Sequence, residues 1–298
     1  MKILVTGSRG QLGYELQQFA ASFPQGRFVF VDIDELDITD GDEVMEFVSL
    51  HRPEFIINTA AYTAVDRAED EPVAAERVNA FAVGHLVKAA FSVNAYLLHV
   101  STDYVFDGKK TEPYVETDAV NPLSVYGRTK LEGERAVQSY KRGIVVRTSW
   151  LYSSTGNNFV RTMLRLGGER DSVRVVNDQV GSPTYAADLA AALLRIVAKV
   201  AVQPGLFEAG IFHYTNAGAC SWYEFAEKIM HGGQCDCRVE PCTTEDYPTK
   251  ARRPAHSVLG CGKIQRVYDV VAPAWDDALK RCLKAIIAKQ DAGKNENL

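Results

Sequence analysis

Short apolar runs alternate with longer amphipathic segments along the first half of the chain. Runs rich in β-branched and aromatic residues predict strands at 2–6, 28–32, 55–60, 96–101 and 144–149. Between them, segments with helical spacing begin near Gln11, Asp42, Val73 and Tyr126. The strand runs are apolar on consecutive residues, which is typical of strands buried on both faces. The alternation predicts an α/β fold, a Rossmann-type doubly wound parallel sheet.

After Trp150 the alternation loosens into longer polar loops such as STGNN and YPTKARRP. We therefore expect an NAD(P)-binding Rossmann domain at residues 1–150 and a smaller substrate-binding lobe that makes up most of residues 151–298. The apolar run at 173–176 suggests that the chain returns to the main sheet within residues 173–200. The polar end, residues 288–298, is expected to be frayed.

The composition argues against several classes of function. The chain has 298 residues, of which 46% are hydrophobic, so it can bury a substantial core. The net charge is −5 and basic residues never run beyond a pair, which argues against nucleic acid as a partner. The longest apolar stretch is interrupted by Arg195 and Lys199, and the chain starts directly on a strand-like run. We expect no membrane association and a cytoplasmic location.

All six cysteines lie in the last third of the chain, and three of them form the cluster CDCRVEPC. This spacing lacks the paired CxxC pattern of a tetrahedral zinc site, and no histidine follows at a completing distance. We expect reduced thiols without a metal, as in a reducing cytoplasm.

A glycine-rich loop directly follows the first expected strand. The stretch TGSRGQLG places Gly7, Gly10 and Gly13 in GxxGxxG spacing before a helix. Glycine lets the backbone approach a pyrophosphate, and the helix N-terminus presents free N–H groups to it. Asp32, about 20 residues further on, ends the second strand and can accept from the ribose hydroxyls of an adenosine. The pattern predicts a dinucleotide site.

Two residues of this site pull the choice of cofactor in opposite directions. Asp32 would repel a 2′-phosphate, whereas Arg9 could hold it; a solvated Arg9 is the alternative. We therefore expect NADPH or NADH, with only a moderate preference. Further residues expected around the cofactor lie in the glycine loop, at the ends of the next two strands and in the helix that begins near Tyr126. They are Gln11, Leu12, Asp37, Ile38, Ala60, Ala61, Tyr62, Thr63, Tyr126 and Lys130.

The stretch VYGRTK places Tyr126 and Lys130 one helical turn apart, and Thr102 follows the fourth strand. This set resembles the catalytic triad of the short-chain dehydrogenase/reductases, and the glycine loop is similar to that of their extended members. The resemblance implies that a cofactor gives hydride to a carbonyl carbon while Tyr126 gives a proton to the alkoxide and Thr102 holds the oxygen. We expect Lys130 and the nicotinamide to lower the tyrosine pKa from its usual value of about 10.

The resemblance narrows within that superfamily. The stretches STDYVFDG, NPLSVYGRTKLEGE, RTSWLYSSTGNNF, NDQVGSPT and HYTNAGACSWYEFA together are similar to the dTDP-4-dehydrorhamnose reductases over nearly the whole chain. This similarity implies an oxidoreductase of dTDP-rhamnose biosynthesis, which reduces the 4-keto group of the nucleotide sugar dTDP-4-dehydro-6-deoxy-L-mannose. The substrate residues that it implies are Thr63, Val65, Thr102, Asp103, Tyr104, Tyr126 and Trp150.

Several of these residues have simpler alternatives. Trp150 could be a core aromatic, Val65 could only pack, and Asp103 could only cap a turn. For Asn79, a structural hydrogen bond beside the cofactor is favoured over catalysis. Arg253, with its neighbour Arg252, is the candidate for the substrate diphosphate, because guanidinium groups match phosphate oxygens; a solvated pair is the alternative.

One departure concerns assembly. Some members of the family join two chains through a magnesium ion held by glutamates. Glu15 matches one of these, but Ala187 stands where that pattern has a glutamate. We expect a monomer, or a homodimer without a bridging metal.

Two other functions stay open. A nucleotide-sugar dehydratase or epimerase shares the fold and the triad, although family dehydratases carry Asp-Glu after the threonine, where this chain has Asp103 and Tyr104. A non-catalytic NADP-binding regulatory subunit, similar to that of methionine adenosyltransferase, would need the pocket but not the reaction. The oligomeric state, the cofactor preference and the keto-sugar also stay open.

Overall fold

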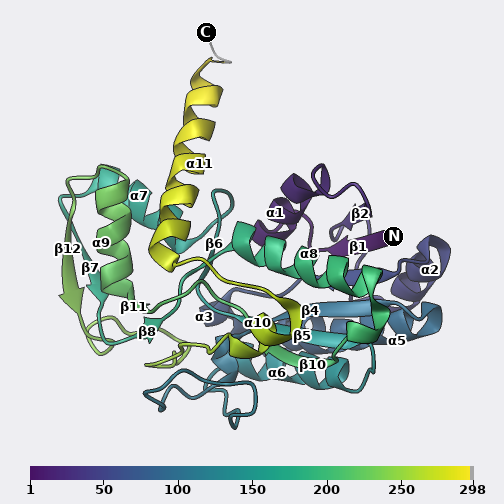
Figure 1. Ribbon diagram of the computed structural model, residues 1–298. Helices are drawn as coiled ribbons and strands as arrows, with labels where there is room; N and C mark the ends of the chain where they lie inside the picture. The colour runs from purple at the N-terminus through teal and green to yellow at the C-terminus, as the bar shows by residue number, and fades with distance from the viewer. Residues whose placement is uncertain (296–298) are drawn as a thin grey trace.

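A six-stranded parallel sheet forms the centre of the computed structural model, which describes residues 1–295 (Figure 1). Its strands are β1 (Lys2–Thr6), β2 (Arg27–Val31), β3 (Phe55–Asn58), β4 (Tyr96–Thr102), β5 (Gly143–Thr148) and β10 (Gly210–His213). Their order across the sheet is β2-β1-β3-β4-β5-β10. The chain passes from β1 to β2 on one side and returns to β3 on the other. This reversal creates a ligand site at the carboxyl ends of β1 and β3, and it confirms the Rossmann-type class.

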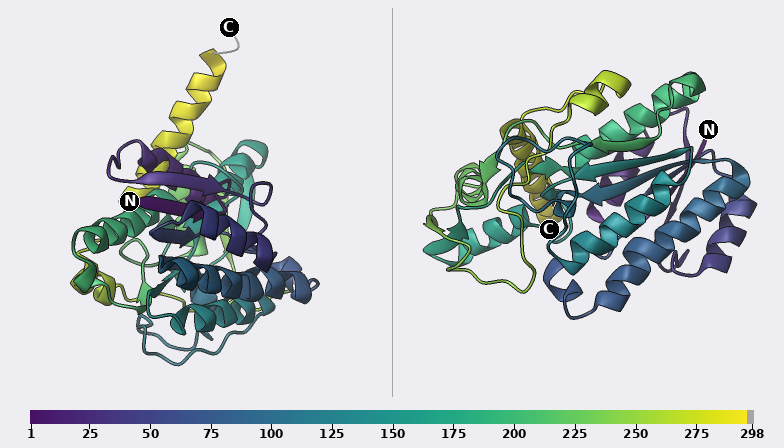
Figure 2. Two further views of the ribbon diagram at one scale, coloured as in Figure 1. Left: turned by 90° about the vertical axis from the view of Figure 1, so that its right-hand side faces the viewer. Right: turned by 90° about the horizontal axis from the view of Figure 1, so that it is seen from below.

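Helices cover both faces of the sheet (Figure 2). One face carries α1 (Gln11–Ala20), α8 (Ala186–Val202) and α10 (Gly262–Tyr268); the other carries α2 (Gly41–His51), α5 (Ala82–Val93) and α6 (Val125–Gln138). Successive strand residues feed the two cores alternately, so that Ile3 and Val5 enter the first and Leu4 the second. Shorter helical segments are α3 (Val65–Ala68), α4 (Pro72–Glu76), the π-helical η1 (Arg77–Phe81), η2 (Asp103–Val105) and η3 (Pro204–Leu206).

The C-terminal lobe, at the left of Figure 1, has a hydrophobic core of its own. Its elements are β6 (Leu151–Tyr152), α7 (Phe159–Glu169), β7 (Ser172–Val176), β8 (Val180–Gly181), β9 (Thr184–Tyr185), β11 (Cys220–Ser221), α9 (Trp222–Gly232), β12 (Arg238–Cys242) and α11 (Trp275–Asn295). Short strand pairs join β7 to β12, β8 to β11 and β6 to β9. Aromatic side chains, among them Tyr152, Phe225 and Trp275, fill the space between the helices and these pairs.

One expectation for the second half of the chain was wrong. The run at 173–176 does not rejoin the main sheet, because β7 pairs with β12 inside the lobe. The chain returns instead through α8, whose Leu189 and Leu193 share a core with α1, and through β10. The sequence analysis missed β10 because its apolar run is very short. Helix α11 extends to Asn295, and residues 296–298 of the end that was expected to be frayed lie outside the described residues, so that expectation stays a prediction.

No helix within the described residues is long and apolar enough to cross a membrane.

Candidate active site

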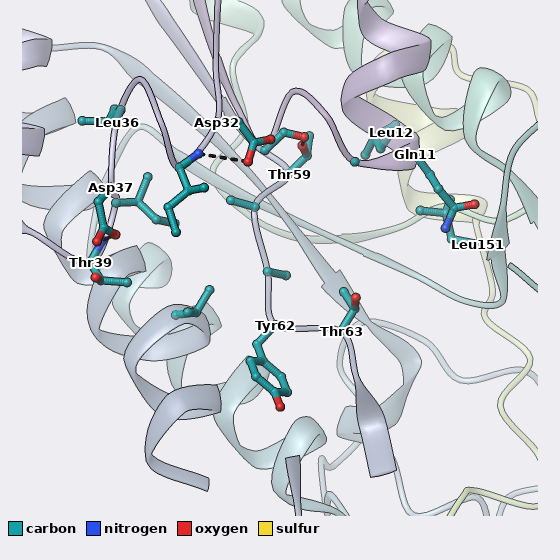
Figure 3. A pocket seen from close by; sticks show the side chains of 17 residues that line it. Gln11, Leu12, Asp32, Leu36, Asp37, Thr39, Thr59, Tyr62, Thr63 and Leu151 are labelled. Carbon is teal, nitrogen blue, oxygen red and sulfur yellow. Dashed lines mark hydrogen bonds between the residues drawn. The ribbon is translucent and has the colours of Figure 1, made fainter. Parts of the chain in front are cut away.

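A pocket of about 430 Å³ opens at the carboxyl ends of β1, β2 and β3 (Figure 3). Lining residues that the sequence predicts for a cofactor are Gly7, Gly10, Gln11, Leu12, Asp32, Asp37, Ile38, Ala60, Ala61, Tyr62 and Thr63. The pocket is also lined by Ile33, Leu36, Thr39, Thr59, Val78 and Leu151, which the sequence analysis missed. Figure 3 shows Asp32 and Asp37 on the side away from Leu151, with Tyr62 and Thr63 along the wall. The pocket therefore runs from an acidic end toward the C-terminal lobe.

The glycines of the loop allow close backbone packing beside this pocket. Gly7 has φ +70°, and a Cβ added there would lie 2.6 Å from the Ala60 nitrogen. A Cβ on Gly13, which does not line the pocket, would lie 2.3 Å from the Gly7 carbonyl oxygen. Helix α1 begins at Gln11 with no side-chain cap and no acidic residue in its first turn. Its first N–H groups are therefore available to a phosphate, so the loop fits a dinucleotide.

The acidic side chains at one end of the pocket are exposed and already have hydrogen-bond or ion-pair partners. The Asp32 carboxylate accepts from the Arg9 backbone N–H at 2.8 Å. The Arg9 guanidinium, 54% exposed, instead forms ion pairs with Asp34 and Glu35. The hydrogen bond to Asp34 is the main reason why the pKa of Arg9 is raised. Arg9 does not line the pocket, so holding a 2′-phosphate requires it to leave these partners.

Thr102 and Tyr126 come together at the edge of the sheet. Thr102 is the last residue of β4, and its hydroxyl accepts from the Tyr104 N–H at 3.2 Å. Tyr126 lies in the first turn of α6, which Ser124 caps by accepting from Gly127. Burial raises the pKa of Tyr126 to about 12, against the opposing effect of a hydrogen bond with Thr102. Burial thus outweighs every other influence on the phenol within the chain itself, whereas the expected lowering of the tyrosine pKa depends on Lys130 and the nicotinamide together and stays a prediction.

Lys130 is directed at strand β4. Its Nζ donates to the Val100 carbonyl oxygen at 2.7 Å and lies 3.5 Å from His99 Nε2. The side chain is 2% exposed, and burial lowers its pKa to about 8, although Glu134 acts in the other direction. Neither Lys130 nor Tyr126 lines the cofactor pocket.

The residues expected on the substrate side surround Tyr126. Tyr104 packs edge-on against its ring with centroids 5.5 Å apart, and Val65 lies in the same apolar cluster. Asp103 is almost fully buried beside Thr102, whose Oγ1 donates to it at 3.1 Å. Burial raises the pKa of Asp103 to about 6.

Two further substrate candidates come from the border of the lobe and from a late loop. Trp150 has φ +47°, a strained value for a bulky residue, and stacks on Trp222 with ring centroids 3.5 Å apart. Arg253 is half-buried and forms an ion pair with Asp66 at 2.7 Å, while Arg252 is exposed. Arg253 is therefore not a solvated residue but part of a contact between the late loop and α3.

Comparison with known proteins identifies the family. The family model described as the RmlD substrate binding domain matches residues 1–287. The chain belongs to this family. It is 43% identical over 286 residues to the dTDP-4-dehydrorhamnose reductase of Aggregatibacter actinomycetemcomitans, with 94% of this chain and 97% of that protein covered.

Solved structures show the same likeness. The dTDP-4-dehydrorhamnose reductase of Clostridium acetobutylicum superposes with a TM-score of 0.88 at 43% identity, covering 95% of this chain and 99% of that one. The dTDP-4-dehydrorhamnose reductase of Bacillus anthracis in complex with NADP also has a TM-score of 0.88, at 38% identity, covering 94% and 98%.

In this RmlD-family chain, the sequence analysis missed a set of buried polar residues behind the triad. Arg147 pairs with Glu134 through two hydrogen bonds of 2.9 and 2.6 Å, one turn after Lys130 on α6. Asn58 and His99 are fully buried on β3 and β4. The signal that could have found them is a polar residue inside an otherwise apolar strand, since such a residue needs a buried partner.

Asn79 lies in the π-helical η1, beside the pocket. Its side chain accepts from the Tyr62 N–H at 2.9 Å and donates to Thr129 Oγ1 at 3.1 Å. It thus ties the pocket wall to helix α6, in keeping with the structural role expected for it.

Within the described residues, no group of three or more His, Cys, Asp and Glu side chains is arranged to hold a metal ion. Glu15 is buried and accepts from Ser153 Oγ at 2.5 Å. All six cysteines are free thiols.

Proposed function

We propose that this chain reduces the 4-keto group of dTDP-4-dehydro-6-deoxy-L-mannose to dTDP-L-rhamnose, with NADPH or NADH as the hydride donor. One observation carries the proposal: a buried Thr102 and Tyr126 stand at the same sheet edge as a pocket that fits a dinucleotide. The choice of substrate is inferred from the name of a relative that matches 94% of the chain. The NADP complex of the Bacillus anthracis relative supports the cofactor.

The chemistry assigned to the triad follows from its burial. A nicotinamide cofactor would supply the hydride to the carbonyl carbon. Because the pKa of Tyr126 is about 12, its phenol is protonated at neutral pH and ready to donate. The alkoxide left by hydride addition is more basic than a phenolate, so the proton passes to it readily. Thr102 orients the substrate oxygen, and the Lys130 ammonium stabilises the phenolate that remains and donates to the cofactor ribose.

The same proposal divides the chain by task. Residues 1–150, together with the returning α8 and β10, form the cofactor-binding domain, and the rest of residues 151–298 mainly covers the substrate. The pocket supports this division, because Leu151 alone among its lining residues lies beyond residue 150. The sugar would lie between Tyr126 and Trp150, bordered by Thr63, Val65, Asp103 and Tyr104. Arg253 would then leave its ion pair with Asp66 and bind the diphosphate of the substrate.

The test is oxidation of NADPH or NADH by the purified chain, with the dTDP-keto-sugar generated in situ and the product identified by chromatography. We expect oxidation that depends on the keto-sugar and yields dTDP-L-rhamnose. A folded protein that binds the cofactor without turnover would contradict the proposal and favour the regulatory-subunit function. Loss of water from a dTDP-hexose would favour a dehydratase. The sequence argues against that function, because Asp103 is followed by Tyr104 where family dehydratases have Asp-Glu.

Assembly and location complete the proposal. We propose a monomer, or a homodimer without a bridging metal, because Ala187 stands where the metal-bridged pattern has a glutamate. Chelation with EDTA should leave the mass from light scattering and the activity unchanged; a dimer that dissociates would contradict this. The free thiols support a cytoplasmic location.

A further inference from the structure

A row of polar side chains crosses three neighbouring strands and ends at helix α6. Thr6, Asn58 and His99 are direct partners in the register of β1, β3 and β4. Each is at most 1% exposed. The Thr6 hydroxyl donates to Asn58 Oδ1 at 2.7 Å, and Asn58 Nδ2 lies 2.9 Å from His99 Nδ1. The row ends at Lys130, whose Nζ lies 3.5 Å from His99 Nε2.

The backbone determines which way this row is oriented. The Ala60 N–H can only donate, and it meets Asn58 at 3.2 Å, so the atom facing it must be the amide oxygen. The Asn58 NH₂ group then faces His99 Nδ1, which must accept. Burial keeps the ring neutral, since it lowers the pKa of His99 well below its usual value. A neutral ring that accepts at Nδ1 carries its proton on Nε2, the atom nearest Lys130.

An N–H aimed at the Lys130 nitrogen favours one protonation state of the lysine. The lone pair of a neutral amine can accept this hydrogen, whereas an ammonium group has no acceptor to offer. Two other polar groups share the α6 face with Lys130, namely Tyr126 and Glu134, and Glu134 is already paired with Arg147 of β5. Asp103 of η2 acts on Tyr126.

We propose that His99, fixed by Asn58 as its Nε2–H tautomer, is a positioning residue that orients Lys130 and makes the loss of its proton easier. Through Asn58 and Ala60 the row also connects Lys130 to the wall of the cofactor pocket. His99 acts through Lys130 and touches neither substrate nor cofactor. The inference about rate rests on the proposed function, whereas the inference about the tautomer does not.

The first experiment reads the tautomer without turnover. Long-range ¹H–¹⁵N spectra of protein labelled with ¹⁵N-histidine distinguish protonated from unprotonated ring nitrogens. We expect His99 to be protonated at Nε2 only. His213 is a matched internal control, because it is equally buried but its Nδ1 faces the Tyr114 carbonyl oxygen at 3.1 Å, which requires the opposite tautomer. An Nδ1–H or cationic His99 would overturn the proposal.

The same spectra report on Lys130. The His99 Nε2 signal should shift with a midpoint near pH 8 in the wild type, as expected for the lysine. The shift should be absent in Lys130→Met. A midpoint that survives this substitution would show that His99 senses another group, and would count against the proposal.

The second experiment uses His99→Asn, which retains an acceptor for Asn58 but removes the N–H that faces Lys130. The cationic lysine is the active form, so the fall in kcat at alkaline pH should move upward by about one pH unit. His213→Asn, the matched loss of a buried imidazole, should leave this limb in place. If the fall in kcat at alkaline pH stays at the wild-type pH in folded His99→Asn, the proposed role of His99 is overturned. Absence of keto-sugar reduction by the wild type would instead refute the proposed function, and the tautomer would still stand or fall on the spectra.

Discussion

The two ends of the candidate active site are built on different physical terms. At the glycine-loop end, Arg9 and Glu35 form an ion pair in which both side chains are about half exposed. At the reaction end, Tyr126 and Lys130 are 9% and 2% exposed. Exposed charges are screened and their pairs contribute little, whereas burial determines the protonation state of each group. Substitutions at the reaction end should therefore have much larger effects than those at the loop end.

The largest effect is expected for Tyr126→Phe. This change removes the transferable proton but keeps the ring that packs against Tyr104, so kcat should fall by about 10² or more. The protein should remain folded and should still bind NADPH, as fluorescence titration can check. Near-wild-type turnover in a cofactor-saturated, folded variant would remove Tyr126 from the chemistry.

Lys130→Met should affect both turnover and binding. It removes the cation that stabilises the phenolate and a proposed donor to the cofactor, so kcat should fall by roughly tenfold to a hundredfold while the Kd for NADPH rises. Folding should not suffer, because methionine removes a charge whose burial is costly. A change confined to the melting temperature would reduce Lys130 to a packing role.

Asp103→Asn should change stability in a way that depends on pH. The carboxyl pKa is raised from 3.8 to about 6, so the folded state binds the proton more tightly than the unfolded state does. The stabilisation that the proton provides is present below pH 4 and is lost as the pH rises through 6. The amide mimics the neutral acid, so the variant should be more stable by about 1 to 3 kcal/mol above pH 6 and equal near pH 4. Urea unfolding at both pH values tests this, and a difference independent of pH would contradict it.

The smallest effect is expected at the exposed end. Arg9→Ala should weaken NADPH binding relative to NADH by less than about fivefold, because the guanidinium must leave Asp34 and Glu35 to meet a 2′-phosphate. The effect should shrink further as salt is added. Kd values for both cofactors at two ionic strengths give the answer. A discrimination of a hundredfold would show that Arg9 leaves its acidic partners and that the two ends are alike.

Local sequence features predicted the frame of the site. Three features could be predicted from the sequence: the strand runs, the spacing of Gly7, Gly10 and Gly13, and the single helical turn between Tyr126 and Lys130. They depend only on side-chain periodicity and on backbone freedom near each residue. These features led to the α/β class, which the structure confirms, and to the family, which the comparisons confirm. Most residues expected around the cofactor line one pocket, because the carboxyl ends of parallel strands meet at one edge of the sheet.

Only the tertiary structure decided which groups lose their water and which distant partners they gain. Arg9 was readable as a charge near the loop, but its pairing with Asp34 and Glu35 depends on how the turn after β2 folds back. Tyr126 was readable as a proton donor, but the direction of its pKa depends on burial under residues far along the chain. The row from Thr6 to Lys130 brings together four elements separated in sequence. Spacing along a chain reports neighbours within a turn or a strand, whereas hydration and long-range pairing exist only once the sheet and its helices have packed.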